Sequence, residues 1–184
     1  MQNDTMGQCL TKTESVFDTL RTIKNDDIPL VSLNGLITFG KVVEVYDGDT
    51  CKIVLVINEK LEKYNCRLKG LDTPEMKPPI SKENRNVEIA NAHKCRNRLL
   101  QLVTDCSCSI ETVIPKKECV KLLDGNTKII KVECFEFDKY GRLLVALFPE
   151  NNSTETANQI LVTEKYAKLY DGGTKSEFTY SDKI

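Results

Sequence analysis

Apolar and polar residues alternate along residues 36–71, and this period of two predicts β-strands. The alternation divides into segments 36–45, 50–57 and 59–71, and the first two are joined by the short connection "YDGD". An Asp-Gly pair between alternating segments is a strong signal for a hairpin turn. Three strands with such short connections predict a β-meander.

The apolar spacing changes to three and four residues between residues 83 and 103, where Ile89, Ala92 and Leu99 fall on one face of a predicted helix. The basic run at 94–98 could contact a polyanion, but we interpret it as the solvated face of this helix. Strand-like patterns then return at 109–114, 128–137 and 141–148. A final helix is expected at about 157–168, with a capping box formed by Thr156 and Gln159.

The order of elements is therefore three strands, a helix, two or three strands and a helix. Strands that meander around a core, with a helix inserted after the third, are typical of a five-stranded Greek-key barrel of the oligonucleotide-binding (OB) fold. The predicted fold class is a β-barrel with helices (α+β), carrying the inserted helix and a C-terminal helix. An open α+β sheet is the alternative. The predicted organisation is an N-terminal extension with a short helix (1–34), a barrel domain (35–170) and a C-terminal tail (171–184).

Composition narrows the class of protein. The 184 residues suffice for one domain with extensions, and their net charge of −1 argues against a protein that coats nucleic acid through a strongly basic surface. Any phosphate binding must therefore be local. No apolar run approaches the length of a membrane span, and the first fifteen residues lack the apolar core of a secretory signal.

The eight cysteines allow either disulfides or free thiols. Without a secretion signal we expect reduced thiols and an intracellular, cytoplasmic protein. A zinc site is not expected, because there is no C-x-x-C motif and the single histidine, His93, lies beside the apolar face of a predicted helix.

Two short motifs carry candidate oxygen ligands. In "DGDT" (47–50) the hairpin turn explains Asp47 and Gly48, but it does not require Asp49, which can serve as a hard-oxygen ligand. In "RLKGLDTPE" (67–75) a proline stiffens the turn, so the Asp72 carboxylate and the Thr73 carbonyl are held in fixed directions. Calcium takes six to eight oxygen ligands, and two carboxylates, a carbonyl and waters form a partial shell with room for a phosphate.

A third motif, "DKYGR" (138–142), ends in an arginine at the start of a predicted strand. Arg67 and Arg142 could form ion pairs at the surface, or they could have a catalytic role. Phosphodiester hydrolysis uses carboxylates and arginines together, because carboxylates bind a metal that polarises the phosphoryl oxygen and can also orient or deprotonate water. Guanidinium groups match the charge that develops on phosphorus.

The three motifs, in this order and with a helix after the second, resemble the staphylococcal nuclease (thermonuclease) family over about residues 36–170. The resemblance implies calcium ligands at Asp49, Asp72 and the Thr73 carbonyl. It implies catalytic residues at Arg67, Glu75 and Arg142. The two arginines would stabilise the transition state, and Glu75 would act as the general base or orient the attacking water.

The resemblance also implies an activity, which is calcium-dependent hydrolysis of DNA or RNA to products with 3′-phosphate ends. The substrate would be single-stranded DNA or RNA, with Lys139 and Tyr140 near a terminal phosphate, and no obligate protein partner is evident. Two features depart from the family pattern. The stretch 115–128 is longer, and Tyr170 is the only nearby candidate for the tyrosines that usually follow the last barrel helix. A catalytically weak or inactive domain that binds nucleic acid or protein is the alternative.

The N-terminal stretch "MGQCLT" (6–11) matches the pattern for N-myristoylation, with Cys9 as a candidate for palmitoylation. Met1 precedes it, so Gly7 is exposed as the N-terminal residue only if translation begins at Met6. Membrane anchoring is expected only in that case, and a chance match is the simpler interpretation.

Overall fold

The computed structural model describes residues 15–150, 152–173 and 178, and contacts divide the chain into two units, 1–32 and 33–184. In the first unit, residues 15–22 are helical and a short 3-10 helix, η1, follows at Asn25–Asp27. Val16 and Leu20 of the helical segment are exposed. The myristoylation pattern lies outside the described residues.

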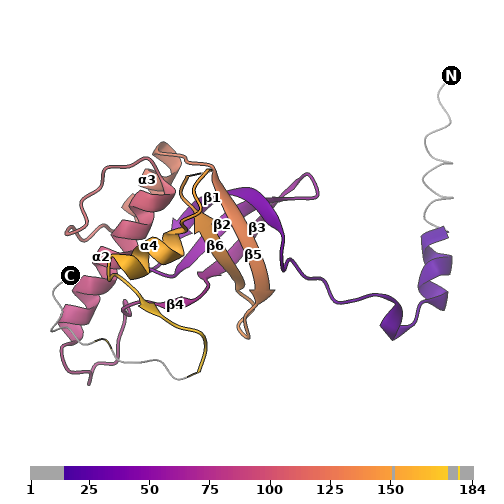
Figure 1. The fold of residues 1–184 in the computed structure, drawn as a ribbon, viewed down its shortest axis with the longest axis horizontal. Coiled ribbons are helices and arrows are strands. Elements are labelled where there is room, and N and C mark those ends of the chain that lie inside the picture. Colours follow the sequence, from indigo (N-terminus) through magenta and orange to yellow (C-terminus); the bar gives the residue numbers. More distant parts are fainter. Residues whose placement is uncertain (1–14, 151, 174–177, 179–184) are drawn as a thin grey trace. The chain divides into compact units, whose positions relative to one another are not determined.

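The second unit is built on a closed barrel of five strands (Figure 1). The strands are β1 (Ile37–Val45), β2 (Thr50–Ile57), β3 (Lys60–Leu68), β5 (Ile130–Phe137) and β6 (Leu143–Phe148). Their order around the barrel is β1-β2-β3-β6-β5, and β5 pairs with β1 to close it. β3 and β6 are parallel, whereas the other neighbours are antiparallel. The predicted five-stranded barrel is therefore confirmed, and the open sheet is excluded.

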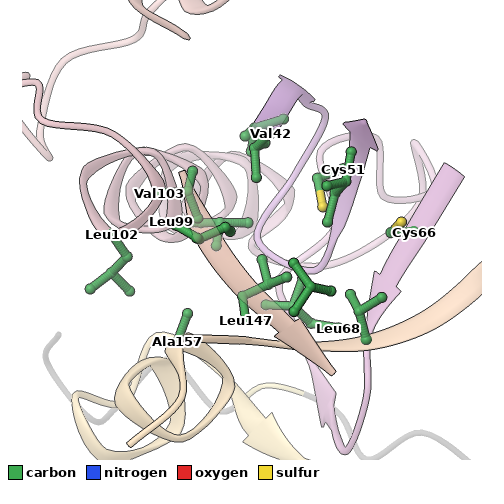
Figure 2. Packing of buried hydrophobic residues seen from close by; sticks show 14 of the residues in the cluster. Val42, Cys51, Cys66, Leu68, Leu99, Leu102, Val103, Leu147 and Ala157 are labelled. Atoms are coloured by element: carbon green, nitrogen blue, oxygen red, sulfur yellow. The ribbon is translucent and has the colours of Figure 1, made fainter. Parts of the chain in front are cut away.

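The alternating pattern of the strands puts one face of each strand into the core. In β2, Cys51, Ile53 and Leu55 are buried, and the same alternation recurs in β6. These side chains belong to one core cluster with Leu99 and Val103 of helix α2 (Arg85–Val103). Figure 2 shows part of this cluster, with Cys51 of β2 and Leu147 of β6 among the labelled side chains. Each fully buried leucine or isoleucine contributes about 1.5–3 kcal/mol, so this core holds the strand ends firmly in place.

Two further helices and a small sheet complete the unit. α3 spans Lys116–Gly125, and α4 spans Ala157–Thr163 with the predicted capping box, in which Gln159 N donates to Thr156 Oγ1. The small sheet pairs β4 (Leu71–Asp72) with β7 (Lys168–Leu169). The predicted end of the last helix at 168 is wrong, because the chain turns at Lys165, which has a φ of 65°, and then enters β7.

The region between α2 and β5 differs most from the prediction. Residues 109–114 are not a strand, and α3, which was not predicted from the sequence, occupies most of the long stretch 115–128. The carbonyls of Ser109, Ile110 and Thr112 accept hydrogen bonds from Asn97 Nδ2 at 3.1, 3.1 and 2.6 Å, so they do not pair with a strand.

The same bonds correct the interpretation of the basic run at 94–98 as a solvated face. Arg96 and Asn97 are both buried, and Arg96 donates to the Ile114 carbonyl at 2.6 Å. Burial and the Arg96 charge lower the pKa of the neighbouring His93.

The seven cysteines within the described residues are free thiols. No helix in the described part of the chain is long and apolar enough to cross a membrane.

Candidate functional site

The three motifs meet at one end of the barrel, where they line a cavity of about 1140 Å³. The turn between β1 and β2 supplies the first motif, β3 and the loop after β4 supply the second, and the turn between β5 and β6 supplies the third. The predicted site residues among its lining are Asp49, Arg67, Thr73, Glu75, Lys139, Tyr140, Arg142 and Tyr170. Asp72 is joined to this set through its contact with Arg67.

The first turn is shaped by Asp47, whose carboxylate oxygen Oδ1 accepts hydrogen bonds from the backbone amides of Asp49 and Thr50 at 3.1 and 2.7 Å. The carbonyl of Thr50 accepts from the Tyr46 amide at 2.9 Å. Gly48 packs so closely that an added Cβ would come within 2.1 Å of Cys95 Sγ on α2. These contacts fix the direction of the buried Asp49 side chain.

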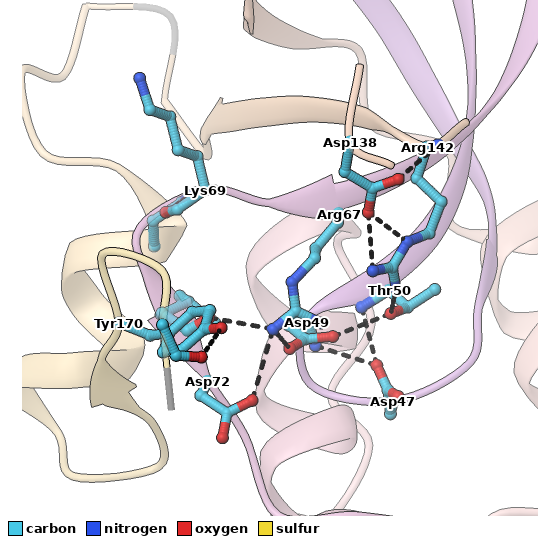
Figure 3. Close-up of polar contacts among 12 residues, drawn as sticks. Asp47, Asp49, Thr50, Arg67, Lys69, Asp72, Asp138, Arg142 and Tyr170 are labelled. Carbon is cyan, nitrogen blue, oxygen red and sulfur yellow. Dashed lines mark hydrogen bonds and ion pairs between the residues drawn. The ribbon is translucent and has the colours of Figure 1, made fainter. Parts of the chain in front are cut away.

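Arg67 joins the first two motifs. Its Nη2 atom lies 2.7 Å from Asp49 Oδ2 and 3.3 Å from Asp72 Oδ1, as Figure 3 shows. The side chains of Arg67, Asp49 and Asp72 are only 14%, 3% and 7% exposed. The pairing of β2 with β3 places Asp49 beside Arg67, because Thr50, the neighbour of Asp49, pairs with Arg67.

Arg142 is held by the third motif. Its Nε and Nη2 atoms lie 2.8 and 2.7 Å from Asp138 Oδ2, and its backbone amide donates to Asp138 Oδ1 at 2.9 Å. Gly141 adopts a φ of 77°, which the tight turn requires and which glycine adopts without strain. Arg142 Nη1 lies 3.5 Å from Thr50 Oγ1, and Thr50 Oγ1 donates to Asp49 Oδ1 at 2.8 Å. A chain of contacts therefore connects the two arginines.

The charges within this site do not balance. Burial and, after it, the negative charge of Asp47 raise the pKa of Asp49 to about 7, although Arg67 opposes both effects. Burial also raises the pKa of Asp47 itself. Asp138 behaves in the opposite way. Burial alone would raise its pKa, but hydrogen bonds from Arg142 and from the Tyr140 amide, with the Arg142 charge, together lower it. The excess of negative charge is therefore concentrated at the first two motifs.

The loop after β4 carries Thr73 and Glu75. Thr73 is buried and its methyl group faces Gly48, since a Cβ on that glycine would lie 2.9 Å from Thr73 Cγ2. Glu75 is exposed at the edge of the cavity, and its backbone amide donates to Glu88 Oε1 on α2 at 3.2 Å.

Aromatic rings and a lysine surround the outer part of the cavity. Tyr140 is 73% exposed, with Lys139 Nζ 5.2 Å from the centre of its ring and Arg142 Cζ 5.5 Å from it. Tyr170 reaches the cavity because its amide donates to the Gly70 carbonyl at 3.0 Å, next to the pairing of β4 with β7. Tyr46 is a further exposed aromatic residue of the lining that the sequence did not indicate.

The oxygen donors and the negative charge of the first two motifs suit a hard divalent cation. Three buried carboxylates, Asp47, Asp49 and Asp72, carry three negative charges when ionised, and Arg67 supplies one positive charge, which leaves an excess of two. Among the described residues no three or more histidine, cysteine or carboxylate side chains gather as a ready-made cage. A cation here would therefore be held by Asp49, Asp72, the Thr73 carbonyl and water, as calcium sites allow.

Besides Tyr46, the sequence did not indicate a role in the site for Asp47, Asp138 or Glu88. The turn alone explains Asp47 in the sequence, and Asp138 belongs to a common turn motif. Glu88 had a signal, because it precedes the buried Ala92, Cys95 and Leu99 at helical spacing and so belongs to the buried face of α2.

No family model matches the sequence, and no curated protein matches it at a significant level.

Proposed function

We propose that this chain is a calcium-dependent phosphodiesterase that hydrolyses DNA or RNA to products with 3′-phosphate ends, as its resemblance to staphylococcal nuclease implies. The observation that carries the proposal is the pairing of opposite charges in one cavity. A buried carboxylate pair, Asp49 and Asp72, shares the Arg67 guanidinium, and a second guanidinium, Arg142, lines the same cavity. Such a site can hold a cation and a phosphate together.

The carboxylates would bind the cation. Burial, and after it the negative charge of Asp47, raise the pKa of Asp49, and a bound divalent cation would offset that penalty. Calcium suits the site because all the available donors are oxygens. Bound calcium would polarise a phosphoryl oxygen of the substrate and activate a water molecule.

The arginines would bind the phosphate and stabilise the charge that develops on it. Each guanidinium is oriented before substrate arrives, Arg67 by two carboxylates and Arg142 by Asp138. The Nη1 atom of Arg142 makes only a long contact of 3.5 Å with Thr50, so it can turn to a phosphate oxygen at little cost. Preorganised donors of this kind contribute more in the transition state than in the ground state.

The remaining residues would orient water and the nucleotide. Glu75 reaches into the cavity from its edge, where it would orient the attacking water or accept its proton. Lys139 and Tyr140 would contact a terminal phosphate. Tyr170, which directly follows β7 in the small sheet, would stack on a base or sugar.

Single-turnover cleavage of an end-labelled single-stranded oligonucleotide tests the proposal, with calcium and then with a chelator. Arg67→Ala, Arg142→Lys and Glu75→Gln should each lower the rate, by on the order of a hundred- to a thousand-fold for the arginines. Mass spectrometry should show 3′-phosphate ends on the products.

Arg98→Ala is the matched control, because Arg98 makes an equally close ion pair, 2.6 Å from Glu164, outside the cavity. Its cleavage rate should match that of the wild type. Folded wild-type protein that binds the oligonucleotide and does not cleave it with calcium would overturn the proposal and support a binding module.

A further inference from the structure

The loop between β4 and α2, residues 73–84, carries Glu75 and is rich in proline. Pro74, Pro78 and Pro79 have no backbone N–H, so this loop has fewer groups with which to secure itself by backbone hydrogen bonds. Arg85 and Glu88 at the start of α2 contact this loop. Arg85 Nε donates to the Pro78 carbonyl at 3.2 Å, and the Glu88 carboxylate accepts from the Glu75 amide at 3.2 Å.

Glu88 is unusual because its side chain is 1% exposed although it is a carboxylate. A buried carboxylate is costly unless its charge is paired and its oxygens are hydrogen-bonded. Here Oε2 forms an ion pair at 2.5 Å with Lys82 Nζ of the same loop, without a hydrogen bond of regular geometry. The first turn of a helix also favours negative charge. Both oxygens of Glu88 are therefore directed to the loop that carries Glu75.

We propose that Glu88 is a positioning residue, and that together with Lys82 it holds the backbone of Glu75 at the edge of the cavity. This inference rests on the proposed function, because it assigns Glu88 to the same site. The Glu75 side chain is exposed, whereas its backbone follows the buried Pro74 and is held at its own amide by Glu88. A displacement of about 1 Å in a catalytic group can cost on the order of a hundred-fold in rate.

A purely structural role for Glu88 makes a different prediction. If Glu88 only stabilised the fold, its removal would lower activity by the same factor whether or not Glu75 is present. If Glu88 acts through Glu75, its removal should matter only while Glu75 has its carboxylate. A double-mutant cycle separates the two cases.

The experiment uses the full chain with Glu88→Ala, Glu88→Gln and Lys82→Gln, each alone and combined with Glu75→Gln. In the wild-type background Glu88→Ala should lower kcat about ten- to a hundred-fold with a much smaller change in KM. Glu88→Gln keeps an oxygen that can accept from the Glu75 amide, so it should retain more of the rate. In the Glu75→Gln background neither substitution should lower kcat further.

Lys94→Gln is the matched control, because Lys94 pairs with Glu111 at 3.0 Å elsewhere on α2. It should leave kcat and KM unchanged. Equal losses of kcat for Glu88→Ala in both backgrounds would overturn the positioning role.

Amide hydrogen exchange gives a readout that does not depend on catalysis. The Glu75 amide should exchange at least ten-fold faster in Glu88→Ala than in wild type, whereas amides in β2 should not change. Lys82→Gln leaves the folded core intact and should show a smaller increase at the same amide. Unchanged exchange at Glu75 in both variants would overturn the inference even if the protein proves to be a nuclease. Faster exchange at Glu75 in Glu88→Ala, together with a wild-type protein that has no nuclease activity, would instead contradict the proposed function alone.

Discussion

Replacing Asp49 with asparagine should stabilise the calcium-free protein at neutral pH, although it removes a buried ion pair. Asp49 has an ordinary pKa of 3.8 and a pKa of about 7 in the folded chain, so the folded state disfavours its ionised form. The difference of about three in pKa, at about 1.4 kcal/mol each, corresponds to roughly 4 kcal/mol as an upper limit. Asparagine has nearly the same shape as the neutral carboxyl and never ionises.

The sign of the pH dependence follows from the direction of the shift. Between pH 4 and 7 the folded chain binds a proton at Asp49 that the unfolded chain has released, so the free energy of unfolding falls as pH rises through this window. The wild type and Asp49→Asn should therefore be about equally stable near pH 4. They should diverge up to pH 7 and keep a constant difference above it.

Urea unfolding followed by circular dichroism, from pH 4 to pH 8 with a chelator present, measures this difference. Asp138→Asn is the control with the opposite sign. Burial alone would raise the pKa of Asp138, but hydrogen bonds from Arg142 and from the Tyr140 amide, with the Arg142 charge, together lower it, so the ionised form stabilises the fold above pH 4 and its loss should destabilise the protein. An Asp49→Asn protein that is less stable than wild type at pH 8 would refute the argument from excess negative charge.

Calcium should cancel this difference in stability. At a calcium concentration of about 1,000 times Kd, binding stabilises the wild type by about 4.1 kcal/mol, which matches the upper limit of the Asp49 penalty, and Asp49→Asn should gain little. The same titration without any stabilisation of the wild type would contradict calcium binding at this site and leave the pH argument untouched.

Three further outcomes are expected. Gly48→Ala should lower thermal stability and calcium affinity, because its Cβ would come within 2.1 Å of Cys95 Sγ, and combining it with Cys95→Ala should restore part of both in calorimetric titrations. Asn97→Ala should lower the free energy of unfolding by about 3 kcal/mol, since it removes three hydrogen bonds to carbonyls, and limited proteolysis should detect the loosened loop. Asp47→Asn keeps the oxygen that accepts two amides but loses the charge that raises the pKa of Asp49, so the fall in stability should shift to lower pH.

The barrel could be predicted because its evidence is local. When one face of a strand is buried, buried and exposed side chains alternate along it, and in β2 and β6 every second residue is buried. The helix α3 was missed because it is short and ends in "DGN", which is typical of a turn. Its buried residues, Cys119 and Leu123, are at helical spacing but are too few to separate a helix from a loop.

Long-range polar contacts could not be predicted in the same way. The sequence shows that Asn97 lies within a helix, but it does not show that a loop of carbonyls returns to its side chain. Arg96 likewise looks like a surface charge until α2 is placed against the Ile114 carbonyl. Such contacts depend on which segments meet after the barrel has closed, and no periodic pattern encodes that.

Asp47 shows why a turn and a site need not be alternative explanations. Its carboxylate accepts two backbone amides and so shapes the hairpin, which is the role that the Asp-Gly signal predicts. The same carboxylate is buried beside Asp49 and raises its pKa, which an asparagine in the same turn would not do. Arg67, held by Asp49 and Asp72, supplies one positive charge against three carboxylates. The hairpin therefore carries negative charge that the fold alone does not need, and a bound cation would neutralise that charge.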